Sequence, residues 1–167
     1  MTPTARDQPD TLVRPARVDD VPGVVAVAAT RGALRDGFAE RARTWVADPA
    51  RRVVVGDRSG VVVGWAMLAR WSGYDDVPDG WYVSALTVDP ACWRRGIGTR
   101  LLADLLVWAE PADGPVRSVV NARNAPSLAL HAAHGFREVR RAPTFARIGF
   151  DGGTGVLLRR DGREDQA

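Results

Sequence analysis

The chain contains no lysine, and all 23 of its basic residues are arginine. Against 20 acidic residues they give a net charge of only +3. The arginines occur singly or in short pairs between acidic residues, whereas a nucleic-acid-binding surface needs a basic patch. The sequence therefore disfavours nucleic acid as a partner. Its bias toward arginine, alanine, valine and glycine is typical of a GC-rich bacterial gene.

Cysteine and long apolar runs are also scarce. Cys92 is the single cysteine, so an internal disulfide is excluded and a reducing cytoplasm is favoured. No apolar run approaches the ~20 residues that span a bilayer, and we therefore expect no membrane partner. The apolar stretch 21–29 follows two aspartates and contains Pro22 and Gly23, which indicates a buried helix and not a leader. We predict a cytoplasmic protein.

The 167 residues, 46% of them hydrophobic, are enough for one domain with a sizeable core. Residues 1–10 are polar with two prolines and are predicted to be a disordered tail, and residues 161–167 form a second polar tail. Residues 11–160 are predicted to be the single domain. A homodimer is compatible with this size, although no feature of the sequence indicates one.

Apolar periodicity and turn residues predict an alternation of strands and helices. Strands are expected at 11–16, 52–55, 61–69, 81–88, 117–121, 136–141 and 155–159. Helices are expected at 19–29, with Asp19 or Asp20 as cap, and at 33–47, 99–109 and 125–134. Residues 56–60 read as a hairpin loop, and residues 71–80 as a turn-rich loop.

The most informative stretch is the strand-to-helix connection within residues 81–110. Asp89-Pro90 stops the strand, because proline lacks a ladder donor, and Arg94-Arg95-Gly96-Ile97-Gly98 then precedes an apolar helix. The first N–H groups of a helix have no internal partner and attract anions, while glycines let a phosphate approach the backbone. An ordinary tight turn is the alternative. The combination with two arginines favours anion binding.

This stretch lacks the lysine of a phosphate-binding loop, and Leu101 stands at the third glycine position of the dinucleotide motif. It resembles motif A of the GNAT (GCN5-related N-acetyltransferase) superfamily, Gln/Arg-x-x-Gly-x-Gly/Ala after a strand. Gly96 and Gly98 match the small positions, and Trp93 stands at the Gln/Arg position. The resemblance implies that acetyl-CoA is the cosubstrate and is bound by Leu86, Thr87, Val88, Arg94, Arg95, Gly96, Ile97, Gly98 and Thr99.

Residues 121–136 resemble motif B of the same superfamily, roughly NxxAxxxYxxxGF. Asn124 takes the asparagine position and Ser127 the small position, and the resemblance adds both to the cofactor-binding residues. His131 falls on the tyrosine position. Independently of any family, Asn124 is a good helix N-cap, and Gly135 suits a left-handed helix stop.

The resemblance implies a mixed α/β fold, with a mostly antiparallel twisted sheet, a splayed parallel strand pair and flanking helices. It also implies an acyl-CoA-dependent N-acyltransferase that moves an acetyl group directly to a primary amine of a small molecule or peptide. A backbone N–H of the central strand would polarise the thioester carbonyl, and a general acid would protonate the thiolate. The alternative function is a non-catalytic acyl-CoA-binding regulator.

His131 is the candidate catalytic residue. As the replacement for the usual tyrosine it could donate a proton to the thiolate or accept one from the amine, or it could simply fill space. His134 lies three residues further on, but no third metal ligand is apparent, so we predict no metal site and a structural role for His134.

The central strand has no glutamate to act as general base. The nearest carboxylates, Asp75, Asp76 and Asp79, could replace it through water, but we expect them to be solvated; if they lined the acceptor cleft they would favour a cationic amine. Trp71, Tyr74 and Trp81 could form an aromatic wall, although core packing explains Trp81 equally well. Cys92 lacks a partner histidine for nucleophilic catalysis. The glycine-rich segment 143–155 is expected to be a mobile loop that selects the acceptor.

Overall fold

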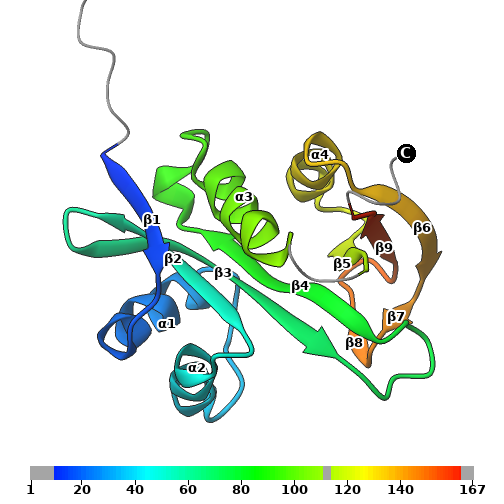
Figure 1. Cartoon of the computed structure of the whole chain (residues 1–167), viewed down its shortest axis with the longest axis horizontal. Coiled ribbons are helices and arrows are strands. Elements are labelled where there is room, and N and C mark those ends of the chain that lie inside the picture. The colour runs from blue at the N-terminus through cyan, green and yellow to red at the C-terminus, as the bar shows by residue number, and fades with distance from the viewer. Residues whose placement is uncertain (1–9, 111–113, 163–167) are drawn as a thin grey trace, which may run out of the picture.

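The structure, a computed structural model, describes residues 10–110 and 114–162. One sheet has the strand order β1-β2-β3-β4-β5-β9-β6 (Figure 1). Its strands are β1 (Thr11–Pro15), β2 (Arg52–Arg58), β3 (Val61–Trp71), β4 (Gly80–Val88), β5 (Val116–Asn121), β6 (Arg137–Ala142) and β9 (Gly155–Arg160). A separate hairpin pairs β7 (Thr144–Phe145) with β8 (Ile148–Gly149). The helices are α1 (Val21–Ala29), α2 (Phe38–Ala47), α3 (Ile97–Ala109) and α4 (Ala125–Ala133), with 3-10 turns at Val18–Asp20 and Pro90–Cys92.

The sheet contains a splayed parallel pair, as predicted. β4 pairs with β5 in parallel only where Trp81–Val83 lie opposite Val116–Ser118, whereas the other neighbouring strands are antiparallel. Beyond Val83, β4 continues to Val88 without pairing to β5. Ser84 forms a bulge, because Met67 and Leu68 of β3 lie opposite residues 85 and 83. The two strands therefore diverge just after the bulge.

Helices cover both faces of the sheet. Side chains alternate along a strand, so Val53 and Val55 of β2 pack with α1 and α2, while Val54 packs with α3. The face of α3 that contacts the sheet consists of Ile97, Leu101, Leu102, Leu105, Leu106 and Ala109, all buried. Figure 1 shows α1 and α2 on one side, α3 on the other, and α4 beside β5, β6 and β9.

Three local predictions are corrected. The helix predicted at 33–47 begins at Phe38, because Gly37 adopts the left-handed conformation (φ 75°) just before it. The hairpin loop predicted at 56–60 is reduced to Ser59 and Gly60, both at positive φ, which suits a two-residue turn. Asp20 does not cap α1; its carboxylate accepts two 2.8 Å hydrogen bonds from Arg14.

Asp20 also accepts a 2.7 Å hydrogen bond from the backbone N–H of Arg17. The bonds from Arg14, in β1, tie this strand to the start of α1. The predicted N-terminal tail, 1–10, lies outside the described residues except for Asp10. The C-terminal tail, 161–167, does so beyond Gly162. Within the described ranges, helices that combine the length and the apolarity of a membrane span are absent.

Candidate active site

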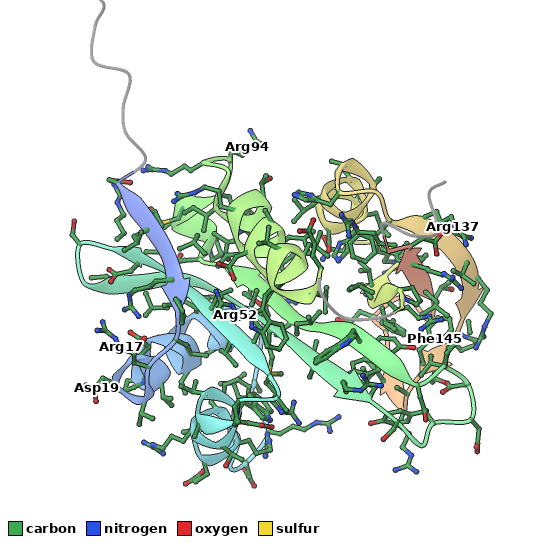
Figure 2. All side chains as sticks on the ribbon, in the orientation of Figure 1. Arg17, Asp19, Arg52, Arg94, Arg137 and Phe145 are labelled. Atoms are coloured by element: carbon green, nitrogen blue, oxygen red, sulfur yellow. The ribbon has the colours of Figure 1, made fainter. Side chains whose placement is uncertain are left out.

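The loop before α3 leaves the start of the helix open. Gly96 precedes the helix at φ 74°, and no side chain among the described residues caps it. The backbone N–H of Arg100 bonds to Gly96 O at 3.1 Å, so the three N–H groups before it are available to an anion. Gly96 and the preceding arginines are exposed, and Arg94 projects away from the body of the molecule (Figure 2). This geometry is what the sequence predicts for an anion-binding turn.

Gly98 lies where α3, α4 and β4 converge. A Cβ at this position would be 3.4 Å from Leu130 Cδ2 and 3.8 Å from Val88 Cγ2. The structure therefore brings the turn at 94–99 next to the end of β4, where residues 86–88 have lost β5 as a neighbour. Most of the predicted cofactor-binding residues thus lie in or next to the end of β4 that is not paired with β5.

Asn124 caps α4 as predicted. Its side-chain oxygen accepts a 3.2 Å hydrogen bond from the backbone N–H of Ser127. At the other end Gly135 has φ 85°, the predicted left-handed stop. Both residues thus have the local roles that their types favour, whatever ligand they also meet.

His131 lies on α4 and is only 2% exposed. Its Nδ1 is 2.8 Å from Ser127 O, a carbonyl that can only accept, so we assign the proton to Nδ1. Nε2 then carries a lone pair, and it is buried without a hydrogen-bond partner among the described residues. Burial is the largest influence on the pKa of His131 and lowers it. The hydrogen bond to Ser127 O raises this pKa, and the nearby His134 lowers it further, but both effects are smaller. The neutral imidazole is therefore favoured.

The other face of the sheet carries an open cavity of about 420 Å³, a size typical of small-ligand sites. It is lined by Trp45 of α2, Arg51, Met67, Arg70 and Trp71 of β3, Ser72 and Tyr74 of the following loop, and Ser84 of β4. Trp71 donates a 2.8 Å hydrogen bond from Nε1 to Ser84 Oγ. The cavity therefore reaches the bulge at which β4 and β5 part.

Two members of the predicted aromatic wall line this cavity and the third does not. Trp71 and Tyr74 are neighbours with ring centroids 6.0 Å apart. Trp81 instead packs edge-on against Trp108 of α3, at 5.6 Å, and belongs to the core on the opposite face. Of the two interpretations of Trp81, core packing is confirmed, because its position in β4 places its side chain with the α3 layer.

Two of the loop carboxylates hold the backbone. Asp76 accepts 3.1 Å hydrogen bonds from the N–H of Ala146 in the β7–β8 turn, and Asp79 accepts one from Gly73. Arg140 also donates to the backbone oxygen of Asp76. The bonds between Asp76 and Ala146 fasten the loop 72–79 to the segment predicted to be a mobile loop, part of which forms the β7–β8 hairpin.

Neither Cys92 nor His134 has a catalytic environment. Cys92 is buried in the core, and both histidines lie on or just after α4, where Nδ1 of His134 is 2.9 Å from Leu130 O. Clusters of metal-ligating side chains are absent from the described ranges.

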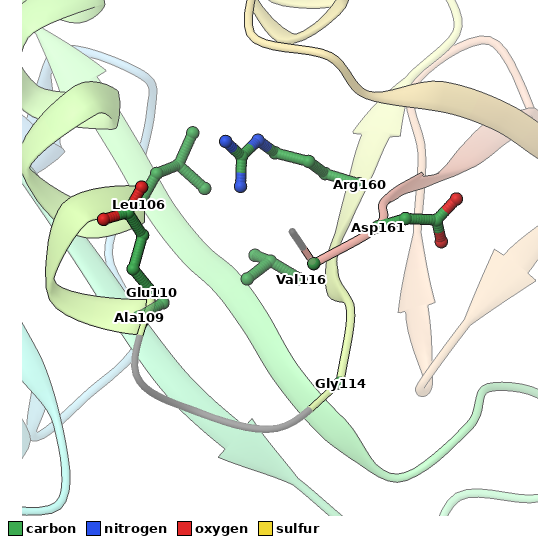
Figure 3. A pocket seen from close by; sticks show the side chains of 8 residues that line it. Leu106, Ala109, Glu110, Gly114, Val116, Arg160 and Asp161 are labelled. Carbon is green, nitrogen blue, oxygen red and sulfur yellow. The ribbon is translucent and has the colours of Figure 1, made fainter. Parts of the chain in front are cut away.

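A smaller cavity lies at the far end of α3 (Figure 3). Its lining includes Leu106, Val116 and Arg160. Arg160 donates a 2.9 Å hydrogen bond from Nε to His134 O and so fastens α4 to β9. This cavity contains none of the predicted site residues.

The model of the acetyltransferase (GNAT) family matches residues 25–136, well over half of the chain. The chain belongs to the GNAT acetyltransferase family. N-alpha-acetyltransferase RimI of Mycobacterium tuberculosis is 34% identical over 116 residues, 70% of each chain. Mycothiol acetyltransferase of Clavibacter sepedonicus is 39% identical over 112 residues, 65% of this chain but 33% of that protein.

Solved structures agree in fold. The acetyltransferase yncA of Salmonella typhimurium, with acetyl-CoA, has a TM-score of 0.75 at 21% identity, covering 90% of this chain and 93% of that one. Ribosomal-protein-alanine N-acetyltransferase of Brucella melitensis has a TM-score of 0.74 at 24% identity, with coverages of 90% and 99%. The sequence predictions of the GNAT fold, of an acyl-CoA-dependent acetyltransferase and of acetyl-CoA as cosubstrate are confirmed.

Sequence reasoning missed several features of this GNAT site. Trp93 donates from Nε1 to Val88 O at 2.9 Å while its ring stays 63% exposed, so it holds the loop against the end of β4. Arg100 has a buried Nη1 without a partner among the described residues. The sequence did contain a signal for the bulge at Ser84. Val83 and Leu86 are apolar and face the same side of the sheet although they lie three residues apart, which breaks the alternation of a regular strand.

Proposed function

We propose that this GNAT acetyltransferase transfers the acetyl group of acetyl-CoA directly to a primary amine, at the gap between β4 and β5. The observation that carries this proposal is the divergence of β4 from β5 after Val83, beside the uncapped start of α3. An extended ligand held at the turn can run along the unpaired edge of β4. The cavity at Ser84 then gives the amine access from the opposite face.

The residues present fit acetyl-CoA, which supplies an activated thioester. The N–H groups at the start of α3 and the two arginines would hold the pyrophosphate, because helix N-termini and guanidinium groups both favour anions. The unpaired edge of β4 offers backbone N–H groups to the arm and to the thioester oxygen. The proposed cofactor residues are Leu86, Thr87, Val88, Arg94, Arg95, Gly96, Ile97, Gly98, Thr99, Asn124 and Ser127.

His131 is the proposed catalytic residue, with a more specific role than its position in the motif implies. In its neutral Nδ1–H form it cannot begin as a proton donor from Nε2. The amine nitrogen bonds to the acetyl carbon, the carbon–sulfur bond breaks, and the proton lost by nitrogen ends on sulfur. Nε2 can accept that proton and return it to the thiolate, so the imidazole is neutral before and after.

A non-catalytic acyl-CoA-binding regulator is not favoured, because the curated relatives are acetyltransferases. A covalent acetyl-cysteine intermediate has no support either: Cys92 is buried, and neither histidine is arranged to activate it.

The pyrophosphate contact is tested with Arg95→Gln and with two forms of the acetyl donor. Calorimetry with CoA should show a dissociation constant about tenfold weaker, as for the loss of one charge-assisted hydrogen bond. Turnover of acetyl-pantetheine, which lacks the pyrophosphate, should not change. Arg43→Gln removes another exposed arginine, on α2, and is the control. Equal losses with both donors would contradict a pyrophosphate contact.

The reaction itself is tested by thiol release from acetyl-CoA with a panel of primary amines. Turnover of at least one amine, with the acetyl group recovered on nitrogen, supports the proposal. CoA binding without turnover of any amine would favour the regulator, and well-folded protein that binds no CoA would overturn the proposal.

A further inference from the structure

The cavity on the α2 face of the sheet combines an aromatic wall with cations. Trp71 is stacked on the buried Tyr82 at 4.2 Å with nearly parallel rings, so its orientation is fixed. Tyr74 lies beside it, and Met67, 4% exposed, is also in the lining. Flat, fixed rings next to a thioether favour an apolar or aromatic group of similar thickness.

Two arginines border this wall from different parts of the chain. Arg51 contributes to the lining, and its Nη1 lies 4.0 Å from the sulfur of Met67. Arg147 reaches from the β7–β8 turn, with its guanidinium 6.0 Å from the ring centre of Tyr74. Arg70 also lines the cavity, but its guanidinium lies over Trp81 at 5.3 Å. We therefore count only Arg51 and Arg147 as cations available to a ligand.

The β7–β8 turn that carries Arg147 is held in an unfavourable conformation. Ala146 (φ 49°) and Arg147 (φ 64°) are consecutive non-glycine residues in the left-handed region. They are the two residues of a hairpin turn, which requires positive φ at both positions and costs free energy where neither residue is glycine. Here the carboxylate of Asp76 accepts the N–H of Ala146 and fixes the turn beside the cavity.

Among the described residues, those that line this cavity include no carboxylate. Asp48 pairs with Arg51, its carboxylate 3.2 Å from Nε, and Nη1 lies against Met67, so these two contacts leave Nη2 for a ligand. Asp76 and Asp79 are bonded to backbone N–H groups. The lining thus offers guanidinium groups and no carboxylate, which complements a ligand that carries an anionic group better than a polyamine.

We propose, on the basis of the function proposed above, that the acceptor is a small primary amine bearing both a carboxylate and an aromatic or other apolar group. The wall of Trp71 and Tyr74 takes the apolar group, and Arg51 and Arg147 take the carboxylate. The amine then faces Ser84, where β4 and β5 part. Its nitrogen forms a bond to the acetyl carbon, the carbon–sulfur bond breaks, and the proton lost by nitrogen ends on sulfur.

Three probes separate the contributions of ring and charge. Phenylalanine has ring, amine and carboxylate; phenethylamine lacks only the carboxylate; spermidine is cationic without a ring. We expect kcat/KM for phenylalanine to exceed that for each of the others by about tenfold or more, as one charge-assisted hydrogen bond would give. A preference for spermidine, or equal rates with phenylalanine and phenethylamine, would overturn the proposal.

Protein variants locate the effect. Arg51→Gln and Arg147→Asn, the latter tolerant of the left-handed turn, should each raise KM for phenylalanine about tenfold and leave phenethylamine unchanged. Tyr74→Ala should weaken the binding of both ring-bearing amines, phenylalanine and phenethylamine, and so raise KM for each. Arg43→Gln removes one positive charge outside the cavity and should not change KM for either amine. Arginine variants that leave the phenylalanine-to-phenethylamine ratio unchanged would refute the charge assignment.

Binding of N-acetylphenylalanine, followed by tryptophan fluorescence, provides a readout independent of turnover. Binding by the unmodified protein that is weakened in Arg51→Gln supports the specificity proposal even where acetyl transfer fails. No binding, together with normal acetylation of another amine, rejects the specificity and leaves the acetyltransferase proposal intact.

Discussion

At the scale of single residues, the buried imidazole of His131 combines a satisfied Nδ1 with an unpaired Nε2. We predict that His131→Phe lowers kcat by about a hundredfold, the lower end of the usual effect of a proton-transfer group. His131→Tyr restores the residue of the family motif and should recover part of the rate. Steady-state kinetics measures both, and an unchanged kcat in His131→Phe would mean that the imidazole only fills space.

The same residue should make stability depend on pH. Burial lowers the pKa of His131 from its ordinary 6.5, so below pH 6.5 the unfolded chain binds a proton that the folded chain does not. The free energy of unfolding should therefore decrease as pH falls through 6.5 toward the lower folded pKa, by at most ~1.4 kcal/mol per pH unit.

Denaturant unfolding between pH 5 and 8 measures this slope, and subtracting the profile of His131→Phe isolates it. Asp20 does not interfere: hydrogen bonds from Arg14 lower its pKa below the ordinary 3.8, so its contribution is lost only in stronger acid. Identical slopes for both proteins would show that His131 titrates normally in the folded chain.

At the scale of elements, α1 approaches β3 closely at Gly23. A Cβ there would lie 2.7 Å from Val62 Cβ, a distance so short that the helix or the strand would have to move. We predict that Gly23→Ala destabilises the protein by about 1–3 kcal/mol, the usual cost of overpacking. Thermal or denaturant unfolding measures the loss.

Gly149→Ala is the matched control, because a Cβ at Gly149 meets nothing within 4 Å. That change should be neutral or slightly stabilising, since alanine restricts the unfolded chain. Equal losses in the two variants would show that the approach of α1 to β3 is not the cause.

At the scale of the whole molecule, a short contact joins the two parts of the sheet. β1–β4 form one antiparallel group and β5, β9 and β6 another, connected by the three-residue pairing of β4 with β5. A ligand that fills the gap beyond Val83 should bind both parts. At CoA concentrations of 100 times Kd, mass action predicts about 2.7 kcal/mol of added stability.

Residue-resolved hydrogen exchange distinguishes binding in this gap from binding elsewhere. CoA should slow the exchange of β4 amides that face β5 between residues 84 and 88, because they gain an acceptor or lose solvent. Amides between β2 and β3 should change only by the global stabilisation. Protection confined to another part of the molecule would contradict the proposed position of the ligand.

The sequence by itself determined the features that depend on neighbouring residues. Gly96 before α3, Asn124 before α4 and Gly135 after it act through their own backbone or the next few residues, so the turn and both helix ends were predictable. The apolar periodicity likewise predicted the strands of the main sheet and the four helices α1–α4, although not the β7–β8 hairpin or the start of α2. Both family motifs consist of residues that are close together in the sequence, and the comparisons confirmed the fold and the enzyme class that these motifs imply.

Only the tertiary structure decided how distant residues meet. The cavity proposed to bind the acceptor joins Trp45, Met67 and Tyr74 from different elements, and Asp76 bonds to Ala146, seventy positions along the chain. Strand register decided that Trp81 faces α3, and burial lowers the pKa of His131. These properties depend on long-range packing and desolvation, which no local pattern of residues encodes.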